Sequence, residues 1–380
     1  MRQSTLRFQP YPPGNESGGT AKLTYTTSSG PLSSTSGKTT TSKYFKSSQK
    51  DSSSTAAPRK DNSKETTSKS ANSKSWADRR AHLKSIADGT LEAIERGSYD
   101  LNGTVHSIQP HLKNSLQGTK FYGAESDLAR WHARWSGIAS RRTVISVLEV
   151  STLEAAWSLS SSASTSASSS LSTPPRRVGI LNFASATKPG GGFINGAQAQ
   201  EESIARSSAI YPSLKSPIAQ SFYRIHSSPK SKKRLRPGFY TDSMVWSPEV
   251  AVFRDDDGGW LDGGGYTVDV VTSAAVNAGV VRQNSQIDHD GEGDEVDIEW
   301  AMRERMARVL FLFEIQGVDT IVLGSFGTGV FRNRVNMVAR IWKELLWKGT
   351  GRFRNSFGKV VFAVLGKETF EEFGRVFREK

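Results

Sequence analysis

A glycine triplet and a pair of acids lie close together in this chain of 380 residues. Gly190, Gly191 and Gly192 are followed, after seven other residues, by Gln200-Glu201-Glu202. Glycine has no side chain, so the backbone can approach a ligand closely there, and carboxylates donate and accept protons. Each piece alone has a simpler explanation, because glycines form turns and acids favour the positive end of a helix.

The residues on either side of the triplet predict how it is held. Residues 178–183 are apolar, as in a buried strand, and residues 201–210 have the pattern of a helix start. The motif is therefore a strand, a glycine loop and a helix N-terminus. Ligands of open α/β sheets bind beyond the carboxyl ends of the strands, where this loop begins.

A second glycine loop, residues 324–330, follows the apolar run 320–323 and precedes a helix that begins near Val335. Its backbone amides are suited to hold a diphosphate, as glycine loops at helix N-termini do. It lacks the Gly-Lys-Ser/Thr ending of a P-loop, so ATP hydrolysis is not indicated. Two glycine loops and an acid pair together favour a nucleotide-diphosphate site.

The remaining apolar runs predict the fold class. Short runs without alternation are typical of strands covered on both faces, and they occupy residues 143–150, 178–183, 250–253, 267–272, 320–323 and 360–365. Helical periodicity is found over residues 78–97, 151–157, 299–315 and 335–347. The alternation predicts an α/β fold, a three-layer α/β/α sandwich with a largely parallel sheet.

Taken together, these motifs resemble the catalytic domain of poly(ADP-ribose) glycohydrolases, and their spacing resembles the microbial, bacterial-type branch. Further matches follow in the family's order over residues 181–186, 207–211, 240–242, 252–255, 273–279 and 323–331. The resemblance covers residues 76 to 380 and implies a macrodomain-like sandwich with a mixed sheet and an N-terminal helical extension. We expect no cofactor and no metal.

The resemblance also implies a role for each residue of the signature. Glu202 is the general acid that protonates the leaving oxygen of a ribose–ribose bond and then, as a base, activates water. Glu201 holds ribose hydroxyls, and Gln200 orders the helix start. Neighbouring residues on a helix point about 100° apart, so the two acids cannot flank one bond and should have different tasks. For Glu202 to act near neutral pH, its pKa should be raised by burial, by Glu201 or by the diphosphate.

The expected substrate contacts come from both loops. Asn182 at its strand end is expected to contact ribose. The other binding residues that we expect are Gly190, Gly191, Gly192, Phe193, Gln200, Gly324, Ser325, Phe326, Gly327, Thr328, Gly329, Val330 and Phe331. Phe326 and Phe331 either stack on adenine or ribose or belong to the core. In the family this aromatic side caps the terminal ribose, which favours release of ADP-ribose from chain ends.

Two other functions fit the same site. One is hydrolysis of mono-ADP-ribose from protein side chains, and the other is a macrodomain reader that binds ADP-ribose without turnover. The intact Gln200-Glu201-Glu202 argues against a reader, which has no use for a proton donor beside the anomeric carbon. Fold analogy alone does not separate these functions.

Composition divides the chain. Residues 1–75 contain 30 Ser or Thr, with 12 Lys or Arg against 4 Asp or Glu, and we expect a disordered basic tail. Residues 76–142 are predicted as a helical extension, and residues 143–380 as the macrodomain-like core with a flexible Ser-rich insertion at 158–175. The tail either contacts nucleic acid or poly(ADP-ribose) through its charge, or is a solvated linker.

Several classes of protein are excluded or disfavoured. The chain has no cysteine, which excludes disulfides and thiolate chemistry, and its six histidines form no metal motif. Residues 288–299 nearly match a calcium-binding loop, but an acidic lead into a helix is simpler. The chain has no apolar run of membrane length, so we expect no membrane contact. We also expect a monomer that is located in the nucleus, the cytoplasm or both. The basic cluster at 230–236 is either an import signal or a solvated loop.

Overall fold

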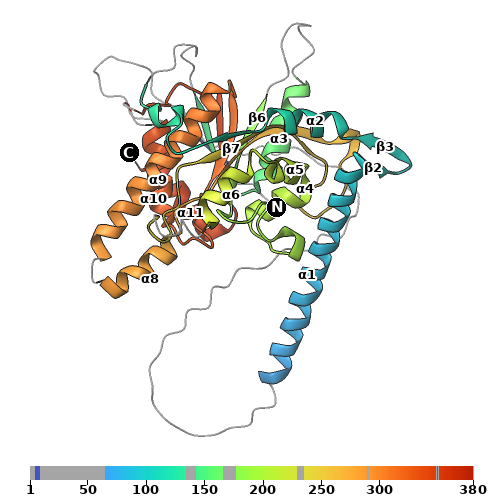
Figure 1. Ribbon diagram of the computed structural model, residues 1–380, viewed down its shortest axis with the longest axis horizontal. Helices are drawn as coiled ribbons and strands as arrows, with labels where there is room; N and C mark the ends of the chain where they lie inside the picture. The colour runs from blue at the N-terminus through green and yellow to red at the C-terminus, as the bar shows by residue number, and fades with distance from the viewer. Residues whose placement is uncertain are drawn as a thin grey trace. The chain divides into compact units, whose positions relative to one another are not determined.

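The computed structural model describes residues 5–8, 65–133, 143–165, 177–228, 235–288, 291–347, 349 and 351–379. All of them belong to one unit, built around an eight-stranded sheet (Figure 1). Across the sheet the strands are β1 (Thr5–Phe8), β5 (Val144–Leu148), β10 (Lys359–Ala363), β9 (Thr320–Gly324), β6 (Val178–Phe183), β8 (Tyr266–Ser273), β7 (Met244–Val252) and β4 (Lys120–Tyr122).

The five strands from β5 to β8 in this order pair in parallel, and the three outer pairings are antiparallel. This is the largely parallel sheet that the apolar runs predict and the mixed sheet that the family resemblance implies.

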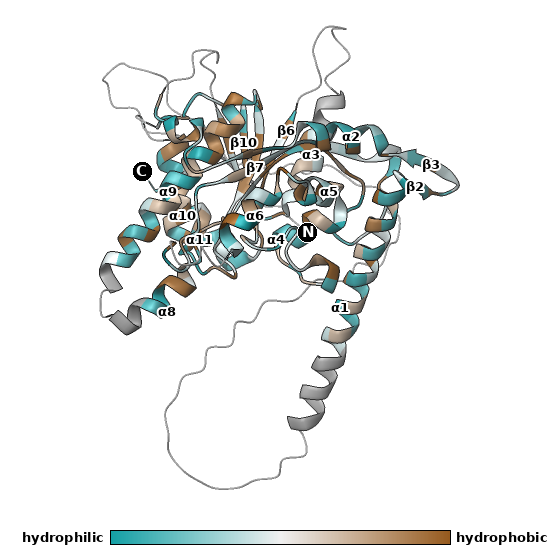
Figure 2. Ribbon diagram, viewed as in Figure 1, coloured by the Kyte–Doolittle hydropathy of each residue, from teal (hydrophilic) through white to brown (hydrophobic). Residues whose placement is uncertain are grey.

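The sheet separates two apolar cores. In β9, Ile321 and Leu323 point into one core and Val322 into the other, as the strand alternation requires. The first core is covered by α8 (Ala278–Asp288), α9 (Gly291–Ile315), α10 (Val335–Leu346) and α11 (Lys367–Arg378). The second core is covered by α3 (Thr152–Thr165), α4 (Gln200–Ser207), α5 (Ile210–Lys215) and α6 (Gln220–Ser227). Apolar colour concentrates in the central strands (Figure 2), and the predicted three-layer α/β/α sandwich is confirmed.

The N-terminal extension packs against the loop that follows the glycine triplet. It consists of α1 (Glu65–Arg96), a hairpin of β2 (Ser98–Leu101) and β3 (Thr104–Ser107), and α2 (Gln109–Gly118). Arg80 Nε on α1 donates to the carbonyl of Asn195 at 2.8 Å, and Thr90 Oγ1 donates to the carbonyl of Arg206 at 2.5 Å. The extension therefore supports the loop and α4 directly.

Two boundaries differ from the sequence-based expectation. Helix α1 begins at Glu65, and Thr5–Phe8 pairs with β5, so both elements include residues assigned to the tail. The rest of that tail lies outside the described residues, and its disorder stays a prediction. Strand β7 begins at Met244, six residues before the predicted strand at 250–253. Met244, Val245 and Trp246 form a separate buried apolar run, and the register with β8 shifts between Ser247 and Val250, where polar residues interrupt the apolar pattern.

The prediction that residues 158–175 form no regular element is wrong for its first half. Helix α3 continues to Thr165. Leu159 is buried in the core and Ser160 Oγ donates to the carbonyl of Ala156 at 2.9 Å, so the helix is anchored and the hydroxyl is satisfied. Residues 166–176 lie outside the described part of the chain.

The acidic run at 288–299 is also helical from Gly291 onward, which leaves no loop of calcium-binding type over those residues. Within the described part of the chain, no cluster of three or more metal-ligating side chains occurs. Among the described helices, none is both long and apolar enough to span a membrane.

Candidate active site

Three loops meet at one edge of the sheet. They follow β6, β8 and β9, which are adjacent parallel strands with their carboxyl ends at the same edge. The rings of Phe183 and Phe326 join the first and third loops, with centroids 5.5 Å apart. Asn333 Nδ2 donates to the carbonyls of Val276 at 2.7 Å and Gly327 at 3.0 Å, which joins the second and third loops. Both predicted glycine loops therefore lie at one site.

The first glycine loop is shaped around the acid pair. Gly190 and Gly191 adopt φ angles of 67° and 60°, which glycine tolerates far better than other residues. A Cβ atom on Gly191 would collide with Glu202 Oε1 and lie 2.8 Å from Glu202 Cδ and 3.0 Å from Glu201 Oε2. The Gly192 N–H donates to Glu202 Oε1 at 2.9 Å. The triplet is thus a surface against which both carboxylates rest, and only glycine fits at its centre.

Gln200 joins the start of α4 to the end of β6. Its Oε1 accepts the Phe183 N–H at 2.8 Å, and its Nε2 donates to the carbonyl of Leu181 at 2.7 Å and to Thr152 Oγ1 at 3.1 Å. The side chain replaces ladder partners on the β9 side of β6, because β6 pairs with β9 only up to Ile180 but pairs with β8 up to Phe183. These contacts tie the first residue of α4 to β6, and the role of Gln200 in ordering the helix start stays a prediction.

The two acids have different surroundings. Glu201 is 3% exposed, and its Oε2 accepts the Ser185 N–H at 2.6 Å. Burial raises the pKa of Glu201 to about 8, with a further rise from the charge of Glu202 and an opposing effect of the Ser185 hydrogen bond. Glu202 is 9% exposed and lies one helical turn before Arg206, which is also buried. Burial lowers the pKa of Arg206. The charge of Glu202 opposes this shift, because it favours the charged form of the guanidinium.

Asn182 and Phe193 are both enclosed. Asn182 has no exposed surface, and its Nδ2 donates to Thr272 Oγ1 at 3.3 Å. Phe193 is buried with its ring against Tyr211, the centroids being 5.0 Å apart. The buried ring of Phe193 therefore anchors the glycine loop in the second core. The ribose contact of Asn182 stays a prediction.

The second glycine loop is closed by hydrogen bonds from its own backbone, where the Asn333 N–H donates to the Gly327 carbonyl at 3.1 Å, and by hydrogen bonds from side chains. The Gly324 carbonyl accepts Trp342 Nε1 at 3.1 Å, and Thr328 Oγ1 donates to the carbonyl of Ser325 at 3.0 Å. Gly327 has a φ of 75°, and a Cβ atom there would collide with Ala275 and lie 2.7 Å from Asn333 Nδ2. Gly329 and Val330 at the tip are exposed, which leaves this part of the loop accessible to a ligand.

The two aromatic residues of this loop differ in exposure, since Phe326 is buried and Phe331 is partly exposed. Phe326 has no exposed surface and packs in the core, so its side chain is a core residue here and does not face a ligand. Phe331 keeps an exposed part and lies beside Tyr240, with centroids 5.9 Å apart. Phe331 is therefore the partly exposed aromatic residue of this loop, and its contact with ribose or adenine stays a prediction.

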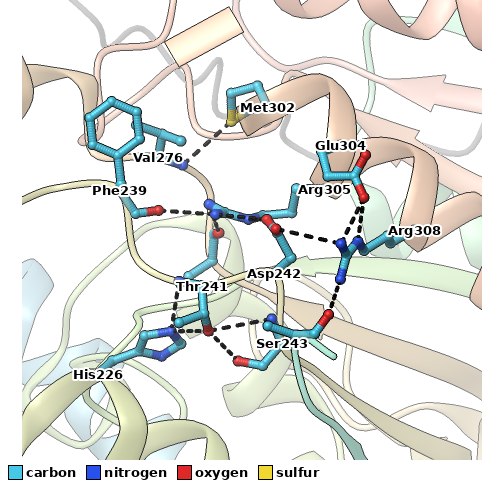
Figure 3. A network of polar contacts seen from close by, with 12 residues as sticks. His226, Phe239, Thr241, Asp242, Ser243, Val276, Met302, Glu304, Arg305 and Arg308 are labelled. Carbon is cyan, nitrogen blue, oxygen red and sulfur yellow. Dashed lines mark hydrogen bonds and ion pairs between the residues drawn. The ribbon is translucent and has the colours of Figure 1, made fainter. Parts of the chain in front are cut away.

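A buried arginine network, which the sequence analysis did not find, holds the neighbouring loops (Figure 3). Arg305 on α9 is 1% exposed and donates to the carbonyl of Ala274 at 2.8 Å, to that of Phe239 at 3.0 Å and to Asp242 Oδ1 at 3.1 Å. His226 Nε2 accepts the Thr241 N–H at 3.1 Å. Burial and the charge of Arg305 lower the pKa of His226 to about 4. The signal in the sequence is Arg305, which lies between Met302 and Met306 in the apolar repeat of residues 302–309.

The fold and the site define a macrodomain-like α/β/α hydrolase, in which a glycine loop rests against an acid pair at the start of α4, beside a second glycine loop. A family model described as the catalytic domain of microbial-type PARG matches residues 87–255. This chain belongs to the family of microbial-type poly(ADP-ribose) glycohydrolases, which are glycoside hydrolases acting on poly(ADP-ribose).

Solved structures agree with this assignment. The poly(ADP-ribose) glycohydrolase of Thermomonospora curvata is 37% identical, with a TM-score of 0.64, over 79% of this chain and 100% of that one. The same enzyme bound to the inhibitor ADP-HPD is 36% identical, with a TM-score of 0.63, over 79% and 99%. The Deinococcus radiodurans enzyme in complex with ADP-ribose is 33% identical, with a TM-score of 0.58, over 74% and 98%. Among curated proteins, no match to this chain was found.

Proposed function

We infer that this chain hydrolyses the ribose–ribose O-glycosidic bonds of poly(ADP-ribose) and releases ADP-ribose, with Glu202 as the general acid and base. The observation that carries the assignment of Glu202 is its hydrogen bond of 2.9 Å from the Gly192 N–H, which fixes the carboxyl on the glycine loop. A carboxyl held against a loop that a ligand can approach closely is placed to protonate a leaving oxygen.

The reaction needs one proton donor that later becomes a base. The bond between the anomeric carbon and the leaving oxygen breaks through an oxocarbenium-like state, and the oxygen takes the proton of Glu202. The Glu202 carboxylate then removes a proton from the water that adds to the anomeric carbon, so Glu202 ends the cycle protonated. Glu201 binds ribose hydroxyls in this scheme, and the two glycine loops bind the diphosphate through backbone N–H groups.

Release from chain ends is the mode of action that we propose. Phe331 is partly exposed and Val330 is 79% exposed at the tip of the second loop. An aromatic and an aliphatic side chain there would pack over the terminal ribose and disfavour a polymer that continues past it. Digestion of long polymer tests this, because chain-end release yields ADP-ribose from the first time points, whereas internal cutting first yields shorter oligomers.

The substrate class is tested by offering the protein poly(ADP-ribose) and mono-ADP-ribosylated protein side by side. Turnover of the polymer alone supports the proposal. Turnover of the mono-modified protein alone would reassign the chain to that hydrolase class, and ADP-ribose binding without turnover of either would make it a reader.

Partners and location are part of the same proposal. ADP-ribosylated proteins carry the substrate, and the basic N-terminal residues attract poly(ADP-ribose) or nucleic acid through counterion release. We propose a monomer that reverses ADP-ribosylation in the nucleus or cytoplasm, in the response to DNA damage. Deletion of residues 11–62, which retains β1, should weaken polymer binding and flatten its salt dependence, and an unchanged salt dependence would remove the tail from this role.

A further inference from the structure

Three arginines lie beside the tip of the second glycine loop. Arg332 and Arg334 follow Phe331 closely in the chain, and Arg282 lies on α8. Arg282 Nη1 donates to the carbonyl of Arg332 at 2.8 Å. Arg282 and Arg334 also share one carboxylate, that of Glu295, at 2.5 and 3.5 Å. These contacts gather the three arginines, called the arginine cluster below, next to the part of the loop that is accessible.

The arginine cluster has more positive charge than its described acidic partner offsets. Its three guanidinium groups face one carboxylate, that of Glu295, which leaves a net charge of +2. Within the described part of the chain, the guanidinium of Arg332 is exposed and has neither a hydrogen bond nor an ion pair. The nearby described acids of α9 pair with other arginines: Asp294 and Asp297 with Arg236, and Glu299 with Arg303 and Arg340.

Two of the arginines stand where local preferences favour other residues. Arg332 has a φ of 58°, a left-handed conformation that glycine and asparagine adopt more readily. The Arg332 N–H donates to the carbonyl of Gly329 at 3.0 Å, which helps to hold this conformation. Arg334 is the N-cap of α10, where the helix dipole favours an acid over a cation. Two cations kept against these preferences indicate an anionic ligand that offsets the cost.

We propose that the arginine cluster binds the diphosphate of a second ADP-ribose unit of poly(ADP-ribose), the unit that keeps the leaving oxygen when the terminal unit is released. The proposal rests on the glycohydrolase function proposed above. The terminal unit occupies the site between the two glycine loops, and the next unit is covalently linked to it. Its diphosphate is therefore held at high effective concentration beside the loop tip. The planar fork of a guanidinium group fits phosphate oxygens.

The cluster should act on polymer and not on free ADP-ribose. A single ADP-ribose molecule fills the site and has no second diphosphate to reach the arginines. The cluster should therefore lower the KM for polymer without changing ADP-ribose affinity. Because the contacts are ionic and exposed, their effect should weaken as the salt concentration rises.

The test compares wild type with the double variant Arg332→Gln/Arg334→Gln, which leaves Arg282 in place. Initial rates on poly(ADP-ribose) should be measured from about 50 to about 200 mM salt, and ADP-ribose binding by calorimetry. In the double variant, KM at low salt should rise about tenfold and the slope of log KM against log salt should fall by about one to two. Dissociation of ADP-ribose should stay within about twofold of wild type, because one bound unit does not reach the cluster.

Arg375→Gln/Arg378→Gln is the matched control. It removes two exposed arginines from the last turn of α11, so the net charge changes equally. Its KM and salt dependence should equal those of wild type.

Arg332→Gly separates ligand binding from a structural role. Glycine adopts the φ of 58° without strain, so this variant removes the cation and keeps the turn. Its melting temperature should match that of wild type while KM for polymer rises. A fall in melting temperature with an unchanged KM would show that Arg332 has a structural role only.

Three further results would overturn the inference. One is an unchanged KM and salt dependence in the double variant. Another is an equal loss of ADP-ribose binding, which would assign the cluster to the unit inside the site. The third is inhibition of wild-type turnover by single-stranded DNA at the phosphate concentration of the substrate, absent in the double variant, which would make the cluster a nucleic-acid site.

Failure of the proposed function gives a different result. Wild type would then bind poly(ADP-ribose) and ADP-ribose without turnover of the polymer. Polymer binding measured directly would still test the cluster, because a loss of polymer affinity in the double variant, with ADP-ribose affinity retained, would support it. Equal polymer affinity in both proteins would overturn it.

Discussion

The Gly192 N–H donates a 2.9 Å hydrogen bond to Glu202 Oε1, so the glycine loop and the proposed acid are one structural unit. The loop follows β6 and the acid lies on α4, and the contact fixes the carboxyl relative to the sheet edge. A backbone donor cannot be removed by mutation of its side chain. The neighbouring glycine, however, can be changed.

Gly191→Ala should strongly reduce turnover of poly(ADP-ribose). Its Cβ atom would meet the carboxyl of Glu202 at 2.8 Å from Cδ, at a residue whose φ is 60°. The displaced acid should cost about a hundredfold in kcat/KM, since small misplacements of reacting groups cost that much. Gly349→Ala is the control, because its Cβ would meet nothing within 4 Å. Equal activity of the two variants would show that the close approach at Gly191 is unimportant.

Gln200→Ala should reduce both stability and activity. The variant loses three hydrogen bonds and leaves the Phe183 N–H and the Leu181 carbonyl without this partner. Unpartnered buried groups cost about 1–3 kcal/mol, which denaturant unfolding would measure. Gln117→Ala on the exposed side of α2 serves as the comparison. If both substitutions have the same small effect, Gln200 does not hold the helix start.

Asp242→Asn should destabilise the protein far more than a surface acid does. Arg305 is 1% exposed and has Asp242 as the carboxylate that offsets its charge, so the loss leaves a buried cation bound only to carbonyls. The free energy of unfolding should fall by about 3 kcal/mol. Asp127→Asn breaks an exposed pair with Arg130 at 3.9 Å and should cost less than about 1 kcal/mol. Similar losses in both would argue against a structural role for the network in Figure 3.

The free energy of unfolding should depend on pH in the direction that the raised pKa of Glu201 sets. Its folded pKa of about 8 lies above the ordinary value of 4.5, so the folded state holds more protons between these values. Stability from this group is complete below about pH 4.5 and is lost as the pH rises through about 8. Glu201→Gln should therefore gain stability relative to wild type as the pH rises from 5 to 9, as thermal unfolding would show.

Glu295 provides a comparison of opposite sign. Its side chain bonds Arg282 at 2.5 Å, and that hydrogen bond lowers its pKa. Its contribution is present above its unfolded pKa and is lost as the pH falls through the lowered folded value. Glu295→Gln should therefore cost stability at neutral pH and nothing in strong acid. If the two variants had the same pH trend, the assignment of the Glu201 shift would be wrong.

The sequence was sufficient for the parts of the site that are local. The glycine triplet, the apolar run before it and the Gln-Glu-Glu signature predicted a strand, a loop and a helix start, and β6 and α4 lie there. Period and composition cannot show which acid is buried more deeply, because that depends on Tyr223 and Asn182 from other elements. Arg305 and Asp242 are 63 residues apart, so their contact exists only in the folded chain. Phe326 shows the same limit, because the sequence of a glycine loop does not show whether its aromatic side chain packs in the core or faces a ligand.

The role of Glu202 is tested most directly by release of ADP-ribose from purified poly(ADP-ribose). Wild type, Glu202→Gln and Glu202→Ala should be assayed together, with ADP-ribose binding measured for each. We predict turnover by wild type, loss of turnover by at least about a hundredfold in both variants, and binding within about tenfold of wild type in Glu202→Gln. Turnover that survives in Glu202→Gln, with binding intact, would contradict the assignment of Glu202 as the proton donor.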